Sequence, residues 1–285
     1  MREITLQELL EAGCHFGHQV PKGHPKAQEF VYTNRDKIQI IDLVKTKKGL
    51  EEAANFLRDL ASGGGKIIFL GTKKQAKNVI AEEAKRCGAF YVTERWVGGF
   101  LTNWEEVRKN LKAMDQIREE LTKDKWTKKE KLLMERRLKK LEKLYEGVES
   151  LKDEQPDALY IIDVRKEKGA LKETERVGIP CVAIVDTNVN PDLVAWPIPA
   201  NDDAVGSIKL ITAFLANAVL EGRQIFEKKG AAEEKTEEAV EKKVENKEKV
   251  AKPKAKKKVA IAEDTGEKGK KKETATKVKR VKKKT

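Results

Sequence analysis

Four side chains could hold a divalent metal ion if the fold brings them together. Asp186 ends the apolar run CVAIV, and Asp202 and Asp203 follow the next apolar run, just before a helical pattern. In a parallel sheet these positions share the carboxyl edge, where ligands usually bind. With His18 from the N-terminal segment, they would supply the oxygen and nitrogen ligands that suit zinc or a similar ion. The competing interpretation is that Asp202 or Asp203 caps the following helix and Asp186 caps a turn.

The remaining histidines do not form a catalytic pattern. His15, His18 and His24 lie in one segment without a His-x-x-x-His pair, and no Ser or Cys nucleophile has a readable base nearby. We therefore expect loop histidines that pack or contact a polyanion. The expectation for the whole chain is that it is not an enzyme.

The turn Gly71-Thr72-Lys73-Lys74 could bind a phosphate. It follows the apolar run KIIFL and opens a helical pattern, so its backbone N–H groups could face an anion. No further glycines complete a dinucleotide fingerprint or a Walker motif, and the glycines at 63–65 precede the strand instead of following it. We expect a tight turn whose Lys73 and Lys74 face RNA, rather than a nucleotide cofactor site.

The stretch RWVGGFLTNW at 95–104 could also contact RNA. Guanidinium and indole planes stack on bases, so Arg95 and Trp96 beside two glycines suit RNA recognition. The alternative is a bent junction between a strand and a helix, with Trp96 in the core. Spacing alone leaves both interpretations open.

Outside these motifs, short apolar runs alternate with amphipathic helical patterns. The apolar runs predict strands at 66–70, 90–93, 158–163, 181–185 and 196–198. Helical patterns occur near 50–60, 73–87, 167–177 and 204–226. Before them, Thr5-x-x-Glu8 predicts a capping box, and runs at 30–33 and 37–41 predict two extended segments around a turn at 34–36. Apolar strands between helices are typical of an α/β fold with a doubly wound, mostly parallel sheet, as in Rossmann or flavodoxin-like proteins.

Residues 104–148 interrupt this alternation. Their first half carries apolar residues at near-heptad spacing, and after a capping box at Thr127-x-x-Glu130 a second set steps by 4, 3, 4 and 3 from Met134 to Val148. This pattern predicts an inserted antiparallel coiled-coil hairpin, whose arms would project by about 30 Å. The expected organisation is a globular body at 1–103 and 149–229, a hairpin at 104–148 and a tail at 230–285.

Most of the excess positive charge lies in that tail. Residues 230–285 carry 20 Lys and Arg against 11 Asp and Glu, and contribute +9 of the total net charge of +13. The segment has too few apolar residues to form a core, so we expect a disordered Lys-rich tail that binds polyanions without reading sequence. No run of about 18 apolar residues indicates a membrane span. The three widely spaced cysteines indicate neither disulfides nor a metal-binding pair, which favours the reducing cytoplasm.

Several motifs occur in a fixed order that resembles a known family. They are AGCHFGHQ at 12–19, IIFLGTKK at 67–74, RWVGGFLTNW at 95–104, PDALYIIDV at 156–164, GIPCVAIVDTN at 178–188 and PANDDA at 199–204. In these motifs, from about residue 5 to residue 227, the chain resembles the family of the second protein of the bacterial small ribosomal subunit. The Lys-rich segment after about residue 230 is longer and more basic than the end of many members, so the resemblance does not cover it.

The resemblance implies a structural constituent of the small ribosomal subunit, ribosome-bound in the cytoplasm. It also implies contact with small-subunit rRNA and with neighbouring ribosomal proteins, including the large first protein that gathers mRNA, and neither a membrane nor a small-molecule substrate. The set His18, Asp186, Asp202 and Asp203 would then help to shape the docking surface for that partner. Two rival classes stay open: a nucleotide-dependent enzyme on a Rossmann-like body, and a nucleoid-compacting protein driven by the tail.

Overall fold

The computed structural model describes residues 2–123, 125–151 and 154–251, and beyond residue 229 it describes only the backbone. The chain divides into two compact units, Met1–Ala231 and Ala232–Thr285. The sheets, the hairpin and the candidate site described below belong to the first unit.

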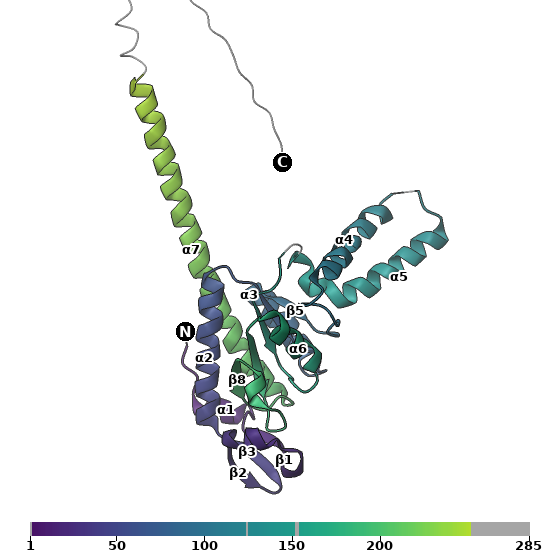
Figure 1. The fold of residues 1–285 in the computed structure, drawn as a ribbon, viewed down its shortest axis with the longest axis vertical. Helices are drawn as coiled ribbons and strands as arrows, with labels where there is room; N and C mark the ends of the chain where they lie inside the picture. Colours follow the sequence, from purple (N-terminus) through teal and green to yellow (C-terminus); the bar gives the residue numbers. More distant parts are fainter. Residues whose placement is uncertain (1, 124, 152–153, 252–285) are drawn as a thin grey trace, which may run out of the picture. The chain divides into compact units, whose positions relative to one another are not determined.

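A parallel sheet of five strands forms the centre of this unit (Figure 1). Its strands are β4 (Ile67–Leu70), β5 (Phe90–Val92), β6 (Ala158–Ile161), β7 (Cys181–Val185) and β8 (Trp196–Pro199). They lie in the order β5-β4-β6-β7-β8, and each neighbouring pair is parallel. The strands β4, β6 and β7 are buried at every position because helices cover both faces of the sheet. The predicted α/β class with a doubly wound, mostly parallel sheet is confirmed.

Alternate residues of each strand enter two separate cores. Phe69 and Tyr160 belong to the core under α2 (Leu43–Ser62), α3 (Lys77–Cys87) and α7 (Val205–Ala251). Ile68 and Leu159 point the other way, into the core under α6 (Lys168–Val177) and the foot of the hairpin. This division follows from the two-residue period of a strand, which sends successive side chains to opposite faces.

The helix boundaries agree with several local signals in the sequence. The predicted capping boxes of Thr5 and Thr127 are confirmed, at the starts of α1 (Leu6–Glu11) and α5 (Lys128–Tyr145). Helix α3 ends as predicted at Gly88, whose φ of +72° is a conformation that glycine adopts without strain. The predicted start of that helix at Lys73 is wrong, because residues 73–76 form turns before α3 begins.

A small antiparallel sheet lies at the N-terminal side of the body. It contains β1 (Phe16–Gln19), β2 (Val31–Arg35) and β3 (Ile38–Ile41), in the order β1-β3-β2. The two extended runs predicted near 30–41 are β2 and β3, and their turn uses positive φ at Asp36 and Lys37. Strand β1 was not predicted, since none of its residues is buried, and exposed and half-buried positions do not alternate along it. Two short 3-10 helices, Val20–Lys22 and Pro25–Phe30, connect β1 to β2.

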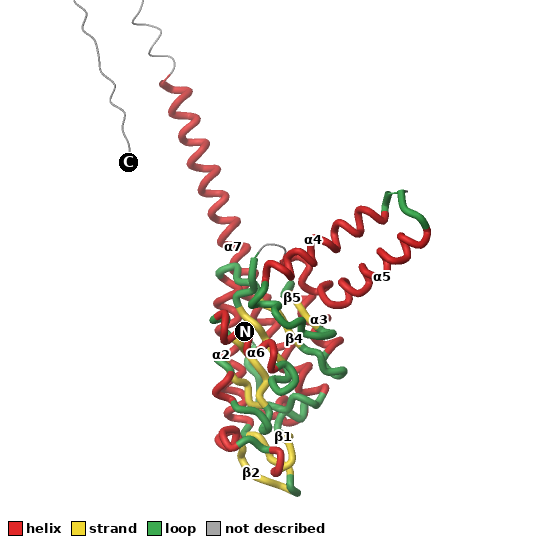
Figure 2. The backbone as a smooth tube through the Cα atoms, turned by 45° about the vertical axis from the view of Figure 1, so that its right-hand side comes forward, coloured by secondary structure: helices red, strands yellow, loops and turns green. Residues whose placement is uncertain are grey.

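The inserted segment forms two packed helices that project from the body, as Figures 1 and 2 show. Helix α4 (Trp104–Leu121) buries one apolar face, and α5 returns beside it to a 3-10 helix at Glu146–Leu151. Arg118 of α4 forms ion pairs with Glu142 (3.0 Å) and Glu149, which tie the two arms together. Whether these arms supercoil as a coiled coil stays a prediction.

Helix α7 is longer than the sequence indicated. The pattern predicted a helix at 204–226 and a disordered tail from 230, whereas α7 continues to Ala251. The added segment consists mainly of Ala, Glu and Lys, which are strong helix formers and were read only for their charge. The predicted disorder of residues 252–285 lies outside the described residues.

One part of α7 also qualifies by length and composition as a membrane span. The segment Val205–Lys229 meets both conditions, although no continuous run of about 18 apolar residues occurs in the sequence. More than half of its most apolar window is buried inside the protein, and Ile208, Ile211 and Leu215 are completely buried against the sheet. These contacts are those of a core helix in a doubly wound fold.

Candidate functional site

The strand order places a ligand-type crevice at the carboxyl ends of β4 and β6. The chain runs from β4 to β5 on one side and returns to β6 on the other, so the topology switches direction between these two strands. In open α/β sheets such a switch point is the usual ligand site. Here it contains the turn after β4, with Thr72 and Lys73, and Asp163, which follows β6.

An ion-pair network fills this crevice. Lys73 Nζ lies 3.0 Å from Asp163 Oδ2, and 2.9 and 2.7 Å from the Oδ1 atoms of Asp202 and Asp203. The contact with Asp202 Oδ1 is ionic, because that buried oxygen receives no hydrogen bond of acceptable geometry. Burial alone would lower the pKa of Lys73, but the neighbouring carboxylates outweigh it and raise the pKa above its ordinary value.

Beside Lys73, the same edge carries the predicted metal-type residues. His18 Nδ1 lies 3.1 Å from Asp186 Oδ2, and its Nε2 lies 3.8 Å from Asp203 Oδ2. The backbone of β1 holds His18 in place, since its N–H donates to Thr187 Oγ1 at 2.9 Å. The hydrogen bond with Asp186, opposed by burial, raises the pKa of His18. All four predicted residues therefore lie together.

The donor atoms of this cluster are of the kind that divalent ions bind. Ligand atoms of His18, Asp186 and Asp202 all lie within 4.8 Å of one another. Burial, with the nearby charge of Asp186, raises the pKa of Asp202 to about 7 despite the opposing charge of Lys73. A metal ion at this position would replace the proton that Asp202 retains. The first part of the capping alternative is not what the structure shows, because Asn201 Oδ1 accepts from the N–H groups of Asp203 and Ala204. The second part agrees with the structure, since Asp186 Oδ1 accepts from the N–H of Thr187 in the turn after β7.

The predicted RNA-contact residues separate into two kinds. Lys74 and Arg95 are exposed and have no ion-pair partner among the described residues. Lys73, by contrast, is engaged by three carboxylates, and Trp96 is only 7% exposed. An RNA base could not stack on Trp96 unless its surroundings unfolded. Trp96 therefore lies in the core, as the alternative interpretation of this stretch predicted.

A buried glutamate, Glu173 of α6, organises the loop that carries Trp96. Its Oε1 accepts from Trp96 Nε1 (3.1 Å) and from the N–H of Gly99 (2.8 Å), and its Oε2 accepts from the N–H of Leu101 (2.9 Å). Burial alone would raise the pKa of Glu173, but these donors outweigh it and hold the pKa below its ordinary value. Sequence reasoning missed Glu173, although it stands between the buried positions Leu171 and Thr174.

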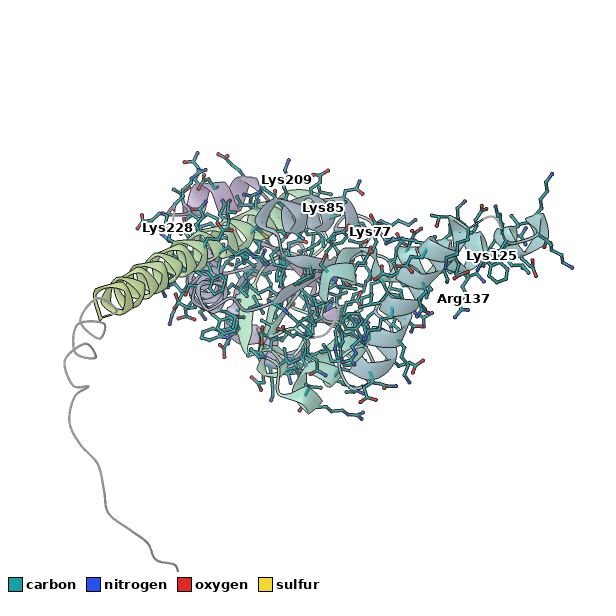
Figure 3. The ribbon with its side chains drawn as sticks, turned by 90° about the horizontal axis from the view of Figure 1, so that it is seen from above. Lys77, Lys85, Lys125, Arg137, Lys209 and Lys228 are labelled. Atoms are coloured by element: carbon teal, nitrogen blue, oxygen red, sulfur yellow. The ribbon has the colours of Figure 1, made fainter. Side chains whose placement is uncertain are left out.

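The outer face of the hairpin carries a second feature that sequence reasoning missed. Lys129, Arg136 and Lys140 share one face of α5, because they are separated by seven and four residues. All three are exposed, and none has an ion-pair partner among the described residues. Figure 3 shows Arg137 and Lys125 along the same projecting element. The heptad pattern identifies the apolar residues between the two helices and gives no information about the cations on the outer face.

Comparison with known proteins identifies the family to which this chain belongs. Residues 9–222 match the family described as "Ribosomal protein S2". The chain belongs to the ribosomal protein S2 family. The protein named "Small ribosomal subunit protein uS2" from Dictyoglomus turgidum is 47% identical over 242 residues, which cover 84% of this chain and 98% of the relative. The protein of the same name from Dictyoglomus thermophilum is 46% identical over the same shares of both chains.

Membership of the S2 family confirms the resemblance carried by the ordered motifs. The match covers the parallel sheet, the hairpin and the cluster around His18, and it ends before the Lys-rich segment. Because the S2 family consists of structural ribosomal proteins, the chain is not an enzyme.

Proposed function

We propose that this chain is a structural constituent of the small ribosomal subunit and acts in translation, bound to the ribosome in the cytoplasm. The observation that carries the proposal is its near-complete coverage of two relatives, each named "Small ribosomal subunit protein uS2". The filled crevice between β4 and β6 supports a scaffold rather than an enzyme, since Lys73 and its carboxylates occupy the place of a nucleotide.

Within the subunit, the chain binds small-subunit rRNA through exposed cations. The proposed contacts are Lys74 and Arg95 on the body and the α5 face formed by Lys129, Arg136 and Lys140. Exposed Lys and Arg without carboxylate partners can replace the counterions of RNA phosphates, which is the main source of affinity for nucleic acid. Lys73 and Trp96 are left out of this surface because the protein itself engages both.

Sedimentation tests both statements. The tagged full chain should co-migrate with small subunits in a sucrose gradient, and Arg136→Ala/Lys140→Ala should lower its share in that fraction. The matched control is Lys209→Ala/Lys228→Ala, which removes two exposed cations from α7 (Figure 3). In rRNA-fragment binding, each lost phosphate contact should reduce the salt slope by about one unit. A full chain that sediments only with free protein would refute the proposal.

The cluster at the carboxyl edge is the proposed docking surface for the mRNA-gathering first protein of the subunit. His18, Asp186 and the pair Asp202 and Asp203 come from distant segments, and ligand atoms of the first three residues lie within 4.8 Å of one another. A bound ion would fix these side chains in one arrangement and neutralise their charge. Asp202→Ala should abolish zinc retention on purified protein and weaken partner capture, whereas Asp192→Ala, an exposed aspartate outside the cluster, should change neither. Equal zinc content in both variants would contradict the metal assignment.

The basic tail discriminates between this function and a nucleoid-compacting protein. Deletion of residues 230–285 removes +9 of the +13 net charge but leaves the S2-family region intact. We expect the shortened chain to enter the small subunit still. A protein whose role depended on the tail would lose most of its nucleic-acid affinity and its place in the gradient together.

A further inference from the structure

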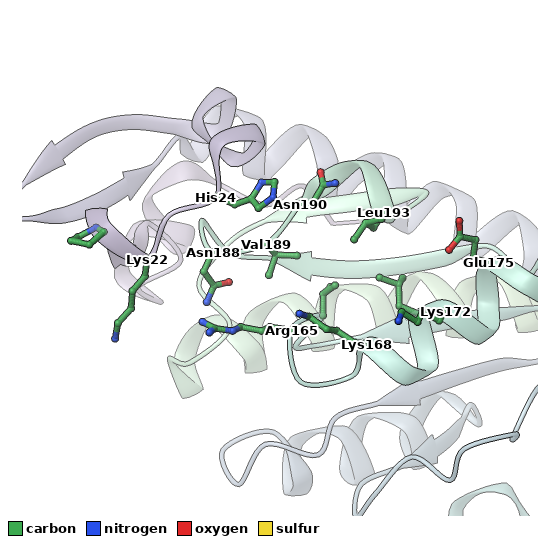
Figure 4. A pocket seen from close by; sticks show the side chains of 13 residues that line it. Lys22, His24, Arg165, Lys168, Lys172, Glu175, Asn188, Val189, Asn190 and Leu193 are labelled. Carbon is green, nitrogen blue, oxygen red and sulfur yellow. The ribbon is translucent and has the colours of Figure 1, made fainter.

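A large cavity of the body lies at the carboxyl ends of β6 and β7. Its volume is about 740 Å³. Its walls come from the loop after β6, the first two turns of α6, the loop after β7 and the N-terminal loop (Figure 4). This size lies within the range of pockets that hold drug-sized or nucleotide-sized groups.

Four cations line one side of this cavity. Figure 4 shows Lys22, Arg165, Lys168 and Lys172 following one another along its edge. All four are exposed, and none has an ion-pair partner among the described residues. Glu175 is the single acidic residue among the described lining side chains. A row of unneutralised cations favours a ligand with several anionic groups in line.

The opposite side of the cavity is apolar and offers amide groups. Val189 and Leu193 face the cations in Figure 4, and Leu193 is 53% exposed although it is a large apolar side chain. Asn190 lies beside them; its Oδ1 accepts from the N–H of Asp192 (3.2 Å), and its NH2 group has no partner among the described residues. A ligand that fits therefore has a flat, weakly polar group on one side and repeated negative charge on the other.

We propose that this cavity binds a short stretch of single-stranded RNA, with the phosphates along the four cations and unstacked bases against Val189 and Leu193. The inference rests on the proposed function, since it assumes that the chain works in contact with RNA. A duplex cannot meet these walls because its bases are paired inward, whereas a single strand exposes the faces and edges of its bases. The planar guanidinium of Arg165 can contact both a phosphate and a base.

Fluorescence anisotropy with a labelled oligouridylate and the full chain tests the site. Arg165→Ala/Lys168→Ala should weaken binding about tenfold and reduce the salt slope by about 0.7 for each cation removed. Leu193→Ser should weaken binding about fivefold and leave the salt slope unchanged, because it removes apolar contact and no charge. All variants keep the basic tail, and Lys209→Ala/Lys228→Ala again serves as the control for charge outside the cavity.

A local measurement separates the cavity from other RNA-binding surfaces. An oligonucleotide that carries 4-thiouridine should crosslink to peptides from residues 164–175 or 188–193, and Leu193→Ser should reduce those crosslinks. Crosslinks confined to other segments, an Arg165→Ala/Lys168→Ala variant with unchanged affinity, or stronger displacement by an acidic peptide than by unlabelled RNA would each overturn the assignment. If Arg136→Ala/Lys140→Ala still weakens subunit binding in that case, the proposed function stands without this site.

Discussion

Replacement of Glu173 by alanine should strongly destabilise the junction between the sheet and the hairpin. Glu173 is 8% exposed, and its carboxylate is the common acceptor for the loop between β5 and α4. That loop also holds Trp96 and Phe100, and Phe100 contacts both Trp96 and Trp104, the first residue of α4, at centroid distances of 4.7 and 5.7 Å. The substitution would remove the acceptor and leave the aromatic residues in place.

The size of the effect follows from the three shortest hydrogen bonds that Glu173 accepts. Glu173→Ala leaves the N–H groups of Gly99 and Leu101 and the indole N–H of Trp96 without their acceptor. A buried donor without a partner costs about 1–3 kcal/mol, and water that enters the vacated space recovers part of that cost. We expect the free energy of unfolding to fall by about 4 kcal/mol, a large share of the stability of a typical domain.

The pH dependence gives the prediction a second test. The pKa of Glu173 in the folded protein lies below its ordinary value of 4.5. The unfolded chain therefore binds the proton more tightly than the folded one, and Glu173 stabilises the fold above pH 4.5. This stabilisation is lost as the pH falls through the lower, folded-state pKa. Glu173→Gln, which has no charge to lose, should show a weaker loss of stability in acid.

Urea unfolding, followed by tryptophan fluorescence, measures these differences. The matched control is Glu175→Ala, an exposed glutamate on the same helix, which should change the free energy of unfolding by less than about 0.5 kcal/mol. The reasoning would be refuted if Glu173→Ala cost less than about 1 kcal/mol with an unchanged denaturant slope. That result would mean that the loop finds its acceptors elsewhere.

Three further predictions concern the carboxyl edge and the foot of the hairpin. Lys73→Met should lower the free energy of unfolding by about 3 kcal/mol near neutral pH, because it leaves buried carboxylates without a compensating charge. The loss should be smaller at about pH 5, where Asp202 is protonated. An equal loss of stability at both pH values would contradict this prediction. Asp202→Asn should flatten the decline in stability as the pH rises from about 4 to about 7, since across that range the folded state retains a proton on Asp202 which the unfolded chain has released; parallel pH profiles in urea titrations would exclude it. Gly147→Ala should cost about 2 kcal/mol in the same assay, because its Cβ would overlap the carbonyl oxygen of Tyr91, whereas Gly169→Ala meets no neighbouring atom and should cost less.

The sequence was sufficient for the architecture because the relevant signals are local. The continuous apolar runs at β6 and β7 identify strands buried on both faces, and they need no knowledge of the rest of the chain. Thr5 and Thr127 mark helix starts through capping boxes that span four residues. Strand β1 was missed for the opposite reason, since its pairing with β3 joins residues that are distant in the sequence, such as Phe16 and Ile40.

The candidate site was only partly predictable, because the sequence shows that a side chain is charged but not which group it pairs with. Asp186, Asp202 and Asp203 were correctly grouped, since they follow parallel strands that share one carboxyl edge, and His18 joins them from β1 of the other sheet. Lys73 emerges at that same edge, and the rule could have placed it among these carboxylates rather than against RNA. A cation read in isolation suggests an external anion, but here the nearest anions belong to the protein.

The two halves of the carboxyl edge have opposite electrostatic character, and this contrast decides which half is available to a ligand. Between β4 and β6, the single cation Lys73 is paired with three acidic side chains, so the usual ligand position is filled and acidic groups outnumber the cation there. Between β6 and β7, four cations line an open cavity with one glutamate among its described lining residues. A ligand that carries phosphates gains affinity only from cations that have no partner inside the protein. RNA is therefore expected to bind between β6 and β7 and not between β4 and β6. The doubly wound fold thus keeps its ligand-binding edge, but displaced by one strand from the switch point.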